Sequence, residues 1–178
     1  MLMKKKKALR SALAGGFLAM ALLLPFLTAS NQQIGNMFLP MHIPVLLCGF
    51  LCGPFWGLAC GAAAPLLRSL LFSMPVMFPT AAAMSFELAA YGFFCGLLYK
   101  ALPKKYISIY ASLLISMIIG RAVWGVVSYI MLSLSGGKFG WEIFISSALL
   151  RAIPGIILQL VIIPPLVILT NRNINKSR

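Results

Sequence analysis

Acidic and histidine side chains are almost absent from this sequence, which has two acidic residues and one histidine among 178 positions. Catalysis by a carboxylate pair, a metal site with three protein ligands and an activated nucleophile each need more of these residue types. The cysteines lack zinc or redox spacing, and no phosphate-binding loop of the form GxxxxGKS or GxxxxGKT occurs. The sequence therefore predicts a protein that is not an enzyme and has no metal or cofactor.

Polar surface is also scarce, because charged residues make up 10% of the chain and hydrophobic residues 61%. Such a composition provides too little polar surface to cover a soluble globule. A membrane-spanning helix needs roughly 20 apolar residues, so this length allows about six helices joined by short loops. We expect an all-α integral membrane protein with six transmembrane helices and a single domain over residues 1–178.

Six apolar segments can be distinguished along the chain. They are Ala8–Ala29, Met37–Gly53, Phe55–Phe72, Thr80–Leu102, Ile107–Leu134 and Ile143–Leu169. The basic start of the chain also fits a signal peptide with a cleavage site at Thr28–Ser30. The first apolar segment, however, is longer than the roughly 7 to 15 residues of a signal-peptide core, which favours a membrane span.

The distribution of basic residues predicts the orientation. Eleven lysines and arginines lie in the N-terminal segment up to Arg10, in the loop Lys100–Lys105 and in the C-terminal tail, whereas the loops on the other side contain only Lys138. The positive-inside rule then places both termini in the cytoplasm. These residues form no basic face with interleaved aromatics, so no nucleic-acid partner is expected.

Glycines recur at every fourth position from Gly49 to Gly61, and Pro54 interrupts this run. Glycines with this spacing lie on one helix face and allow a second helix to approach closely in lipid. Proline removes a backbone donor and clashes with the preceding turn, so one helix should end at Gly53. The sequence predicts two tightly packed helices joined by a minimal turn.

Four ionisable residues lie inside apolar segments: Arg68, Glu87, Arg121 and Arg151. A charge near the centre of a membrane helix costs roughly 2.5 to 3.5 kcal/mol on insertion scales, so such residues indicate a functional site or a compensating partner. Pairing Glu87 with one arginine leaves a surplus of positive charge. This surplus favours a cavity that binds an anion such as a carboxylate.

Each arginine also has a purely structural interpretation. Arg68 can extend to the outer membrane interface, and Arg121 can simply pair with Glu87. Arg151 can satisfy backbone carbonyls that are freed by Pro154.

The other polar and aromatic candidates have similar alternatives. His42 fits an interfacial histidine, and Trp124 fits the aromatic belt at the membrane surface. Asn36 lies in a polar loop that either covers a binding site as a lid or is polar only because it is exposed.

The segment His42–Pro54, HIPVLLCGFLCGP, followed by Gly57 and by Pro65–Leu71, PLLRSLL, resembles the substrate-binding S components of energy-coupling factor vitamin transporters. Riboflavin-type members have a similar IP-x-L-x-G-F-x-x-GP-x-x-G run between their second and third helices. The resemblance covers roughly residues 42 to 99 in motif and the whole chain in layout. It implies a vitamin-uptake subunit in a prokaryotic plasma membrane, with an outward-facing pocket lined mainly by the fourth to sixth helices.

The resemblance also implies partners, namely a transmembrane T component and two ATP-binding subunits. In this family, small residues spaced by four on the first helix dock on the T component, and Ala8, Ala12 and Gly16 match that spacing. Ordinary packing within this subunit is the alternative interpretation. The substrate-binding residues that we expect are Arg68, Glu87, Tyr91, Arg121, Trp124, Arg151, Asn36 and His42.

The substrate is predicted to be an acidic vitamin. Acidic residues common after the second loop of riboflavin-type members are missing here, where His42 stands instead, and this argues against riboflavin. The sequence is similar to pantothenate-type S components, and one carboxylate suits Arg121 or Arg151 while Glu87 accepts a hydroxyl or amide proton. Nicotinate and pyridoxine-like compounds are alternative ligands. Two alternative functions also remain: a stand-alone secondary transporter of organic anions and a purely structural membrane protein.

Overall fold

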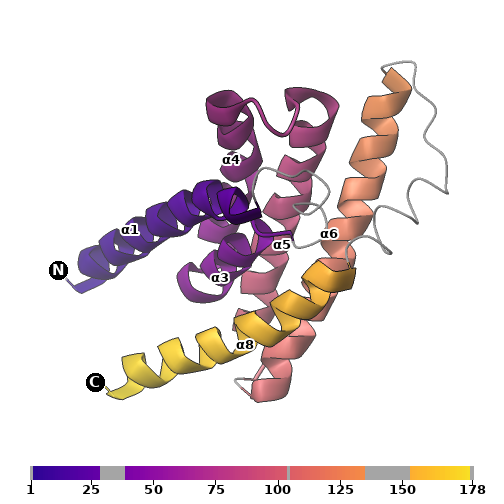
Figure 1. Ribbon diagram of the computed structural model, residues 1–178. Helices are drawn as coiled ribbons and strands as arrows, with labels where there is room; N and C mark the ends of the chain where they lie inside the picture. The colour runs from indigo at the N-terminus through magenta and orange to yellow at the C-terminus, as the bar shows by residue number, and fades with distance from the viewer. Residues whose placement is uncertain (1, 29–38, 104, 135–152, 177–178) are drawn as a thin grey trace.

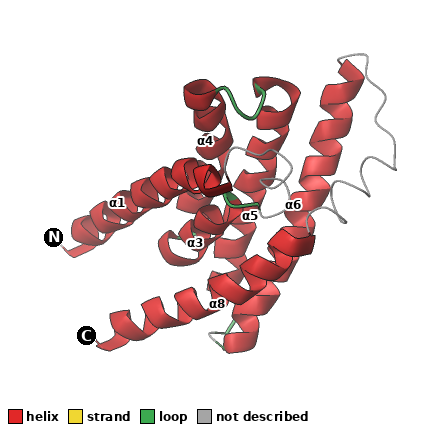
Figure 2. Ribbon diagram, in the orientation of Figure 1, coloured by secondary structure: helices red, strands yellow, loops and turns green. Residues whose placement is uncertain are grey.

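The computed structural model describes residues 2–28, 39–103, 105–134 and 153–176, and every regular element within these ranges is helical (Figure 2). The elements are α1 (Leu2–Leu23), the 3-10 turn η1 (Leu24–Thr28), α3 (His42–Cys52), α4 (Pro54–Phe72), the π-type turn η2 (Met77–Ala81), α5 (Ala82–Ala101), α6 (Tyr106–Leu134) and α8 (Ile153–Lys176). The predicted site residues Asn36 and Arg151 lie outside the described residues.

Five helical segments in the described part are long and apolar enough to cross a membrane. They are Lys7–Phe26, Pro54–Phe72, Met77–Ala101, Tyr106–Ser133 and Ile153–Thr170. The remaining apolar helix, α3, has 11 residues, so at about 1.5 Å per residue it covers about 16 Å of a hydrocarbon layer about 30 Å thick. The all-helical fold is confirmed, whereas six spans and cytoplasmic termini remain predictions.

Helix ends differ from the predicted segments at three places. Within the described part, residues 39–41 of the second segment are not helical and α3 begins at His42. Helix α1 already begins at Leu2 within the basic tail, and α8 continues to Lys176 where a polar tail is expected. Lysine is a good helix former, and backbone hydrogen bonds do not depend on side-chain polarity. Hydropathy therefore marks where a helix can enter lipid and not where the helix ends.

Helix α3 lies at the centre of the bundle, although it is the shortest α-helix in the described part. Most of its residues are buried, because α1, α4, α5 and α8 all pack against it. In Figure 1, α4 and α5 stand side by side, and α6 and α8 cross on the other side of α3 from α1. The core contains Val45 and Leu46 of α3, Leu88 of α5, Leu113 of α6 and Ile163 of α8.

The predicted break at Gly53–Pro54 is confirmed. Gly53 has φ of 104°, a left-handed backbone conformation that favours glycine, and Pro54 begins α4, where its missing backbone donor costs nothing. Gly53 therefore forms the turn and does not belong to the packing face on which its spacing places it. The four cysteines are free and buried, as expected for small apolar side chains.

The other glycines of the run bring a third helix against the α3–α4 hairpin. A Cβ atom on Gly57 would lie 2.7 Å from the Gly92 carbonyl carbon of α5 and 2.8 Å from Gly49 Cα of α3. A Cβ on Gly61 would lie 2.7 Å from the Ala89 backbone nitrogen of α5. The predicted close packing is thus present, and it joins three helices instead of two. This packing also fixes α5 in the interior of the bundle. The packed part of α5 lies about one helical turn from Glu87.

Candidate substrate-binding site

Three helices bring polar side chains together in the interior of the bundle, two of which, Glu87 and Arg121, form an ion pair. Glu87 of α5 is 2% exposed, and its Oε1 atom lies 3.0 Å from Nη1 of Arg121 on α6. The same oxygen lies 3.6 Å from Nε2 of His42 at the start of α3. The ion pair that the structural interpretation of Arg121 requires is therefore present. His42 faces the interior of the bundle, because only 1% of its surface is exposed.

Tyr91 completes this group from the next turn of α5. Its ring meets the His42 ring edge to face, with 5.1 Å between centroids. On its other side, a Cβ atom on Gly120 of α6 would lie 2.9 Å from the Tyr91 ring. The ring is therefore held between α3 and α6, and the predicted site residues His42, Glu87, Tyr91 and Arg121 form one cluster.

The cluster has more hydrogen-bonding capacity than it uses. Nε and Nη2 of Arg121 and both ring nitrogens of His42 are buried and have no hydrogen-bond partner among the described residues. Burying an unpartnered donor costs about 1 to 3 kcal/mol. Nε and Nη2 form one edge of the planar guanidinium, and two parallel donors of this kind match a carboxylate. The Arg121 edge opposite Glu87 is thus suited to a second anion.

Arg68 makes different contacts. Its Nη1 donates a hydrogen bond of 2.7 Å to the Leu22 carbonyl oxygen at the end of α1. Its guanidinium carbon lies 5.0 Å from the Phe26 ring centroid and 5.7 Å from that of Phe72. With 7% of its surface exposed, Arg68 does not extend outward as the interfacial interpretation requires. These contacts join α1 to α4, and substrate binding by Arg68 remains a prediction.

Replacing Arg68 with leucine should loosen the attachment of α1 and leave ligand affinity nearly unchanged. A charged hydrogen bond and two cation–π contacts are together worth about 2 kcal/mol. We expect the apparent Tm of the purified protein to fall by roughly 4 to 8 °C, measured by thermal unfolding in detergent. Exposed Arg10 replaced by leucine is the control. Loss of ligand affinity at unchanged stability would instead place Arg68 in the binding site.

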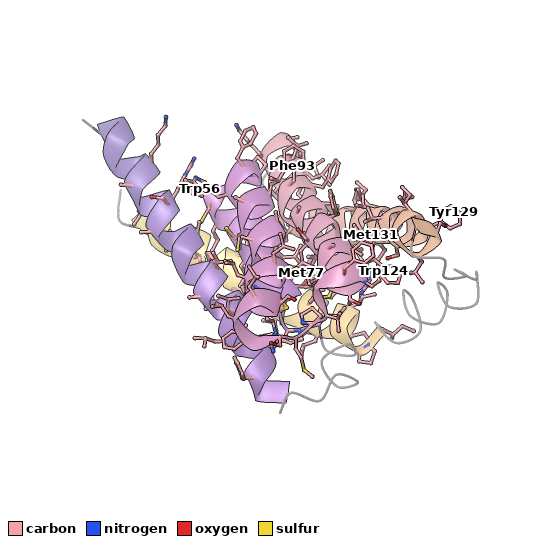
Figure 3. The ribbon with its side chains drawn as sticks, turned by 90° about the horizontal axis from the view of Figure 1, so that it is seen from above. Trp56, Met77, Phe93, Trp124, Tyr129 and Met131 are labelled. Carbon is pink, nitrogen blue, oxygen red and sulfur yellow. The ribbon has the colours of Figure 1, made fainter. Side chains whose placement is uncertain are left out.

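Trp124 lies on α6 one turn beyond Arg121 and is partly buried. Seen from above, it lies on the side of α6 that faces α5, whereas Tyr129 points away from the bundle (Figure 3). Trp124 is therefore placed near the cluster, and its contact with substrate remains a prediction. The expected roles of Asn36 and Arg151 also remain predictions, because both residues lie outside the described part.

A family model described as "ECF transporter, substrate-specific component" matches residues 9–167. The chain belongs to this family. The predicted S component of an energy-coupling factor (ECF) transporter is thereby confirmed, although the vitamin is not specified. No curated protein and no solved structure matches the chain.

This family consists of subunits of membrane transporters and is not an enzyme family. It also implies, in general terms, a vitamin substrate and T-component and ATPase partners. The apolar helices of this S component agree with a multi-pass protein of the cell membrane. The buried cluster joins the Glu87–Arg121 ion pair to His42 and Tyr91 and brings polar groups from three helices together, which makes it the candidate substrate site.

Two buried polar residues of the S component escaped the sequence analysis. Gln159 on α8 is 1% exposed and Ser112 on α6 is fully buried. Gln159 Nε2 and the Ser112 hydroxyl have no hydrogen-bond partner among the described residues. The available signal was the single amide side chain within the apolar run from Ile153 to Leu169, because an uncharged polar residue in such a run also needs a partner.

Proposed function

We propose that this S component binds a small water-soluble vitamin that carries a carboxylate, and that pantothenate is the best candidate. The observation that supports this proposal is the unpartnered Nε–Nη2 edge of Arg121. A substrate carboxylate accepts two parallel hydrogen bonds from this edge, while Nη1 remains paired with Glu87. His42 and Tyr91 line the same cluster and contact the atoms next to the carboxylate.

The structure changes the electrostatic basis of this proposal. Arg121 and Glu87 neutralise one another, and Arg68 is engaged with the end of α1. A second carboxylate beside Glu87 therefore needs a further cation to offset the repulsion between the two anions. The proposed source is Arg151, which lies two positions before the start of α8 in the sequence. The preference for an anion then rests on donor geometry at Arg121 together with this second arginine.

Vitamin screening of the purified protein tests the substrate. A ligand present at a hundred times its Kd stabilises the folded state by about 2.7 kcal/mol, which raises the apparent Tm. Pantothenate should produce this shift, whereas pantothenol, which has an alcohol in place of the carboxylate, should not. A shift with riboflavin, or an equal shift with pantothenol, would contradict the proposal. Nicotinate and pyridoxine are screened in the same way, and a Tm shift with either of them would favour that alternative ligand.

Energised uptake should depend on other subunits. We propose that vesicles containing only this chain bind the vitamin and do not accumulate it, and that accumulation needs a T component and two ATP-binding subunits. The alternative function, a stand-alone secondary transporter, requires accumulation driven by an ion gradient in vesicles without those partners. Uptake of this kind by the chain alone would contradict the present proposal and support the secondary transporter.

We also propose that the exposed face of α1 docks on the T component. Ala8, Ala12 and Gly16 are all exposed, and a Cβ atom on Gly16 would have no described atom within 4 Å. The inner face of α1 instead buries Ala14 and Ala21 in the core. Small residues on the outer face allow another helix backbone to approach closely, which is the main source of helix association in lipid.

Replacing Ala12 with leucine should therefore weaken assembly with the T component by roughly tenfold or more, because a bulky side chain separates the two backbones. Pantothenate affinity should not change, since Ala12 is exposed and away from the site. Co-purification with a tagged T component measures the assembly. The matched control is Ala59→Leu on the exposed face of α4. Equal assembly of the two variants would refute docking through this face.

A further inference from the structure

His42 is the single histidine of this chain, and histidine is the side chain that ordinarily changes its charge between pH 5 and 8. It begins α3 in the interior of the bundle, with 1% of its surface exposed. Both ring nitrogens are buried and have no hydrogen-bond partner among the described residues. A neutral ring has one donor and one acceptor nitrogen, whereas a protonated ring has two donors. The ring can therefore gain a proton without breaking a hydrogen bond to the described part of the chain.

The charged groups next to this ring balance one another. Its Nε2 atom lies 3.6 Å from Oε1 of Glu87, and the same oxygen lies 3.0 Å from Nη1 of Arg121. With a neutral ring, Glu87 and Arg121 together carry no net charge. A ligand carboxylate on the unpartnered edge of Arg121 adds one negative charge to this buried group. A proton on His42 offsets that charge directly beside Glu87.

The other ionisable groups on the helices around α3 are placed differently. Tyr91 of α5 contacts the ring edge to face, and a phenol is ordinarily neutral near pH 7. Arg68 of α4 is hydrogen-bonded to the end of α1. The basic residues of α1 end at Arg10, which interacts with the opposite end of α3 from His42. The part of α8 up to Thr170 contains no ionisable side chain.

The ring and the proposed ligand position are close enough for their charges to interact. Both distances above are measured to one Glu87 oxygen, so His42 Nε2 and Arg121 Nη1 are separated by at most their sum, about 6.6 Å. A carboxylate at hydrogen-bond distance from the other edge of Arg121 then lies within about 12 Å of the ring. At an effective dielectric constant of about 20, a unit charge at that distance favours an opposite one by about tenfold. This coupling does not require the ligand to touch His42.

We propose that His42 takes up a proton when an anionic ligand binds at Arg121. The proton comes from the solvent and forms an N–H bond at the unprotonated ring nitrogen, so that the bound cluster gains one positive charge together with the negative charge of the ligand. This inference rests on the proposed function and makes substrate binding dependent on pH. Arg151 brings a permanent charge, whereas His42 brings a charge that appears with the ligand.

Thermodynamic linkage gives the direction of the pH effect. A bound anion favours the protonated ring, so a protonated ring favours the bound anion by the same factor. Affinity is therefore highest at low pH, where the ring is protonated even without ligand, and falls as the pH rises. We expect pantothenate to bind about tenfold or more weakly at about pH 8.5 than at about pH 5.5. The ligand carboxylate does not cause this change, since a carboxyl group ordinarily titrates near pH 4.

Isothermal titration calorimetry in pairs of buffers with different ionisation enthalpies counts the protons that are taken up with pantothenate. The wild-type protein should take up about half a proton or more per ligand at the midpoint of the affinity change, as a tenfold coupling requires. His42→Gln places an amide nitrogen near the position of Nε2 and does not titrate. This variant should exchange no proton, and its affinity should stay within about threefold of the wild-type value at about pH 8.5 at every pH.

His42→Asn, whose amide nitrogen is nearer the position of Nδ1, is measured alongside, so that the result does not depend on the folding of one variant. Wild-type binding without proton uptake would overturn the role of His42 and leave the Arg121 site intact. Uptake that persists in either variant would assign the proton to another group, such as Glu87, and would also overturn it. If the wild-type protein does not bind pantothenate, the proposed substrate fails and the linked protonation fails with it.

Discussion

Replacing Arg121 with leucine is expected to weaken pantothenate binding at least a hundredfold. The substitution removes the two donors that face the ligand carboxylate, and a bidentate charged hydrogen bond is among the strongest polar contacts in proteins. The loss should be larger for pantothenate than for a neutral ligand such as pantothenol, whose binding does not depend on this charge. Equilibrium dialysis with labelled pantothenate measures the effect directly.

This substitution also leaves Glu87 buried without its partner, and breaking a buried ion pair costs about 3 to 5 kcal/mol. Lost binding must therefore be separated from lost folding. The double variant Arg121→Leu with Glu87→Gln removes the uncompensated charge and should recover most of the thermal stability without recovering affinity. Arg121→Lys keeps the charge and lacks the planar fork, so it should bind with intermediate affinity. Wild-type affinity in the stable double variant would show that Arg121 only pairs with Glu87.

Replacing Gly92 with alanine is expected to lower stability strongly without removing any polar contact. A Cβ atom at this position would lie 2.9 Å from Gly57 Cα, and two further backbone atoms of Gly57 would be closer still. Backbone atoms cannot move aside as the end of a flexible side chain does, so α5 must separate from α4. Overpacking of this kind costs about 3 kcal/mol, and the apparent Tm should fall by roughly 6 to 12 °C.

The same substitution at Gly15 is the matched control. Gly15 also lies within a membrane helix, but a Cβ atom there would have no described atom within 4 Å. Gly15→Ala should therefore keep the wild-type Tm, measured in the same detergent. Equal stability of the two variants would show that the contact between α4 and α5 does not require glycine. Because Glu87 lies on α5, Gly92→Ala should also weaken pantothenate binding in the fraction that stays folded.

Some features of this protein follow from local sequence alone. The scarcity of charge predicts a membrane protein, because hydropathy is a sum over residues and does not depend on how helices are arranged. The break at Gly53–Pro54 depends on the covalent structure of proline and on the conformational freedom of glycine. The close approach at Gly57 and Gly61 follows from the missing side chains. Each of these properties belongs to a residue or to a short segment.

Other features were decided only by the tertiary structure. In the sequence, Arg68 and Arg121 lie in similar apolar segments, yet Arg121 pairs with Glu87 and Arg68 caps the end of α1. The burial of His42 and Gln159 was likewise not predictable from hydropathy. Which side chains meet depends on the rotation, tilt and depth of neighbouring helices, and these are set by contacts between residues far apart in the chain. Residue spacing constrains only one helix at a time, so it identified the charged residues without showing which of them share a site.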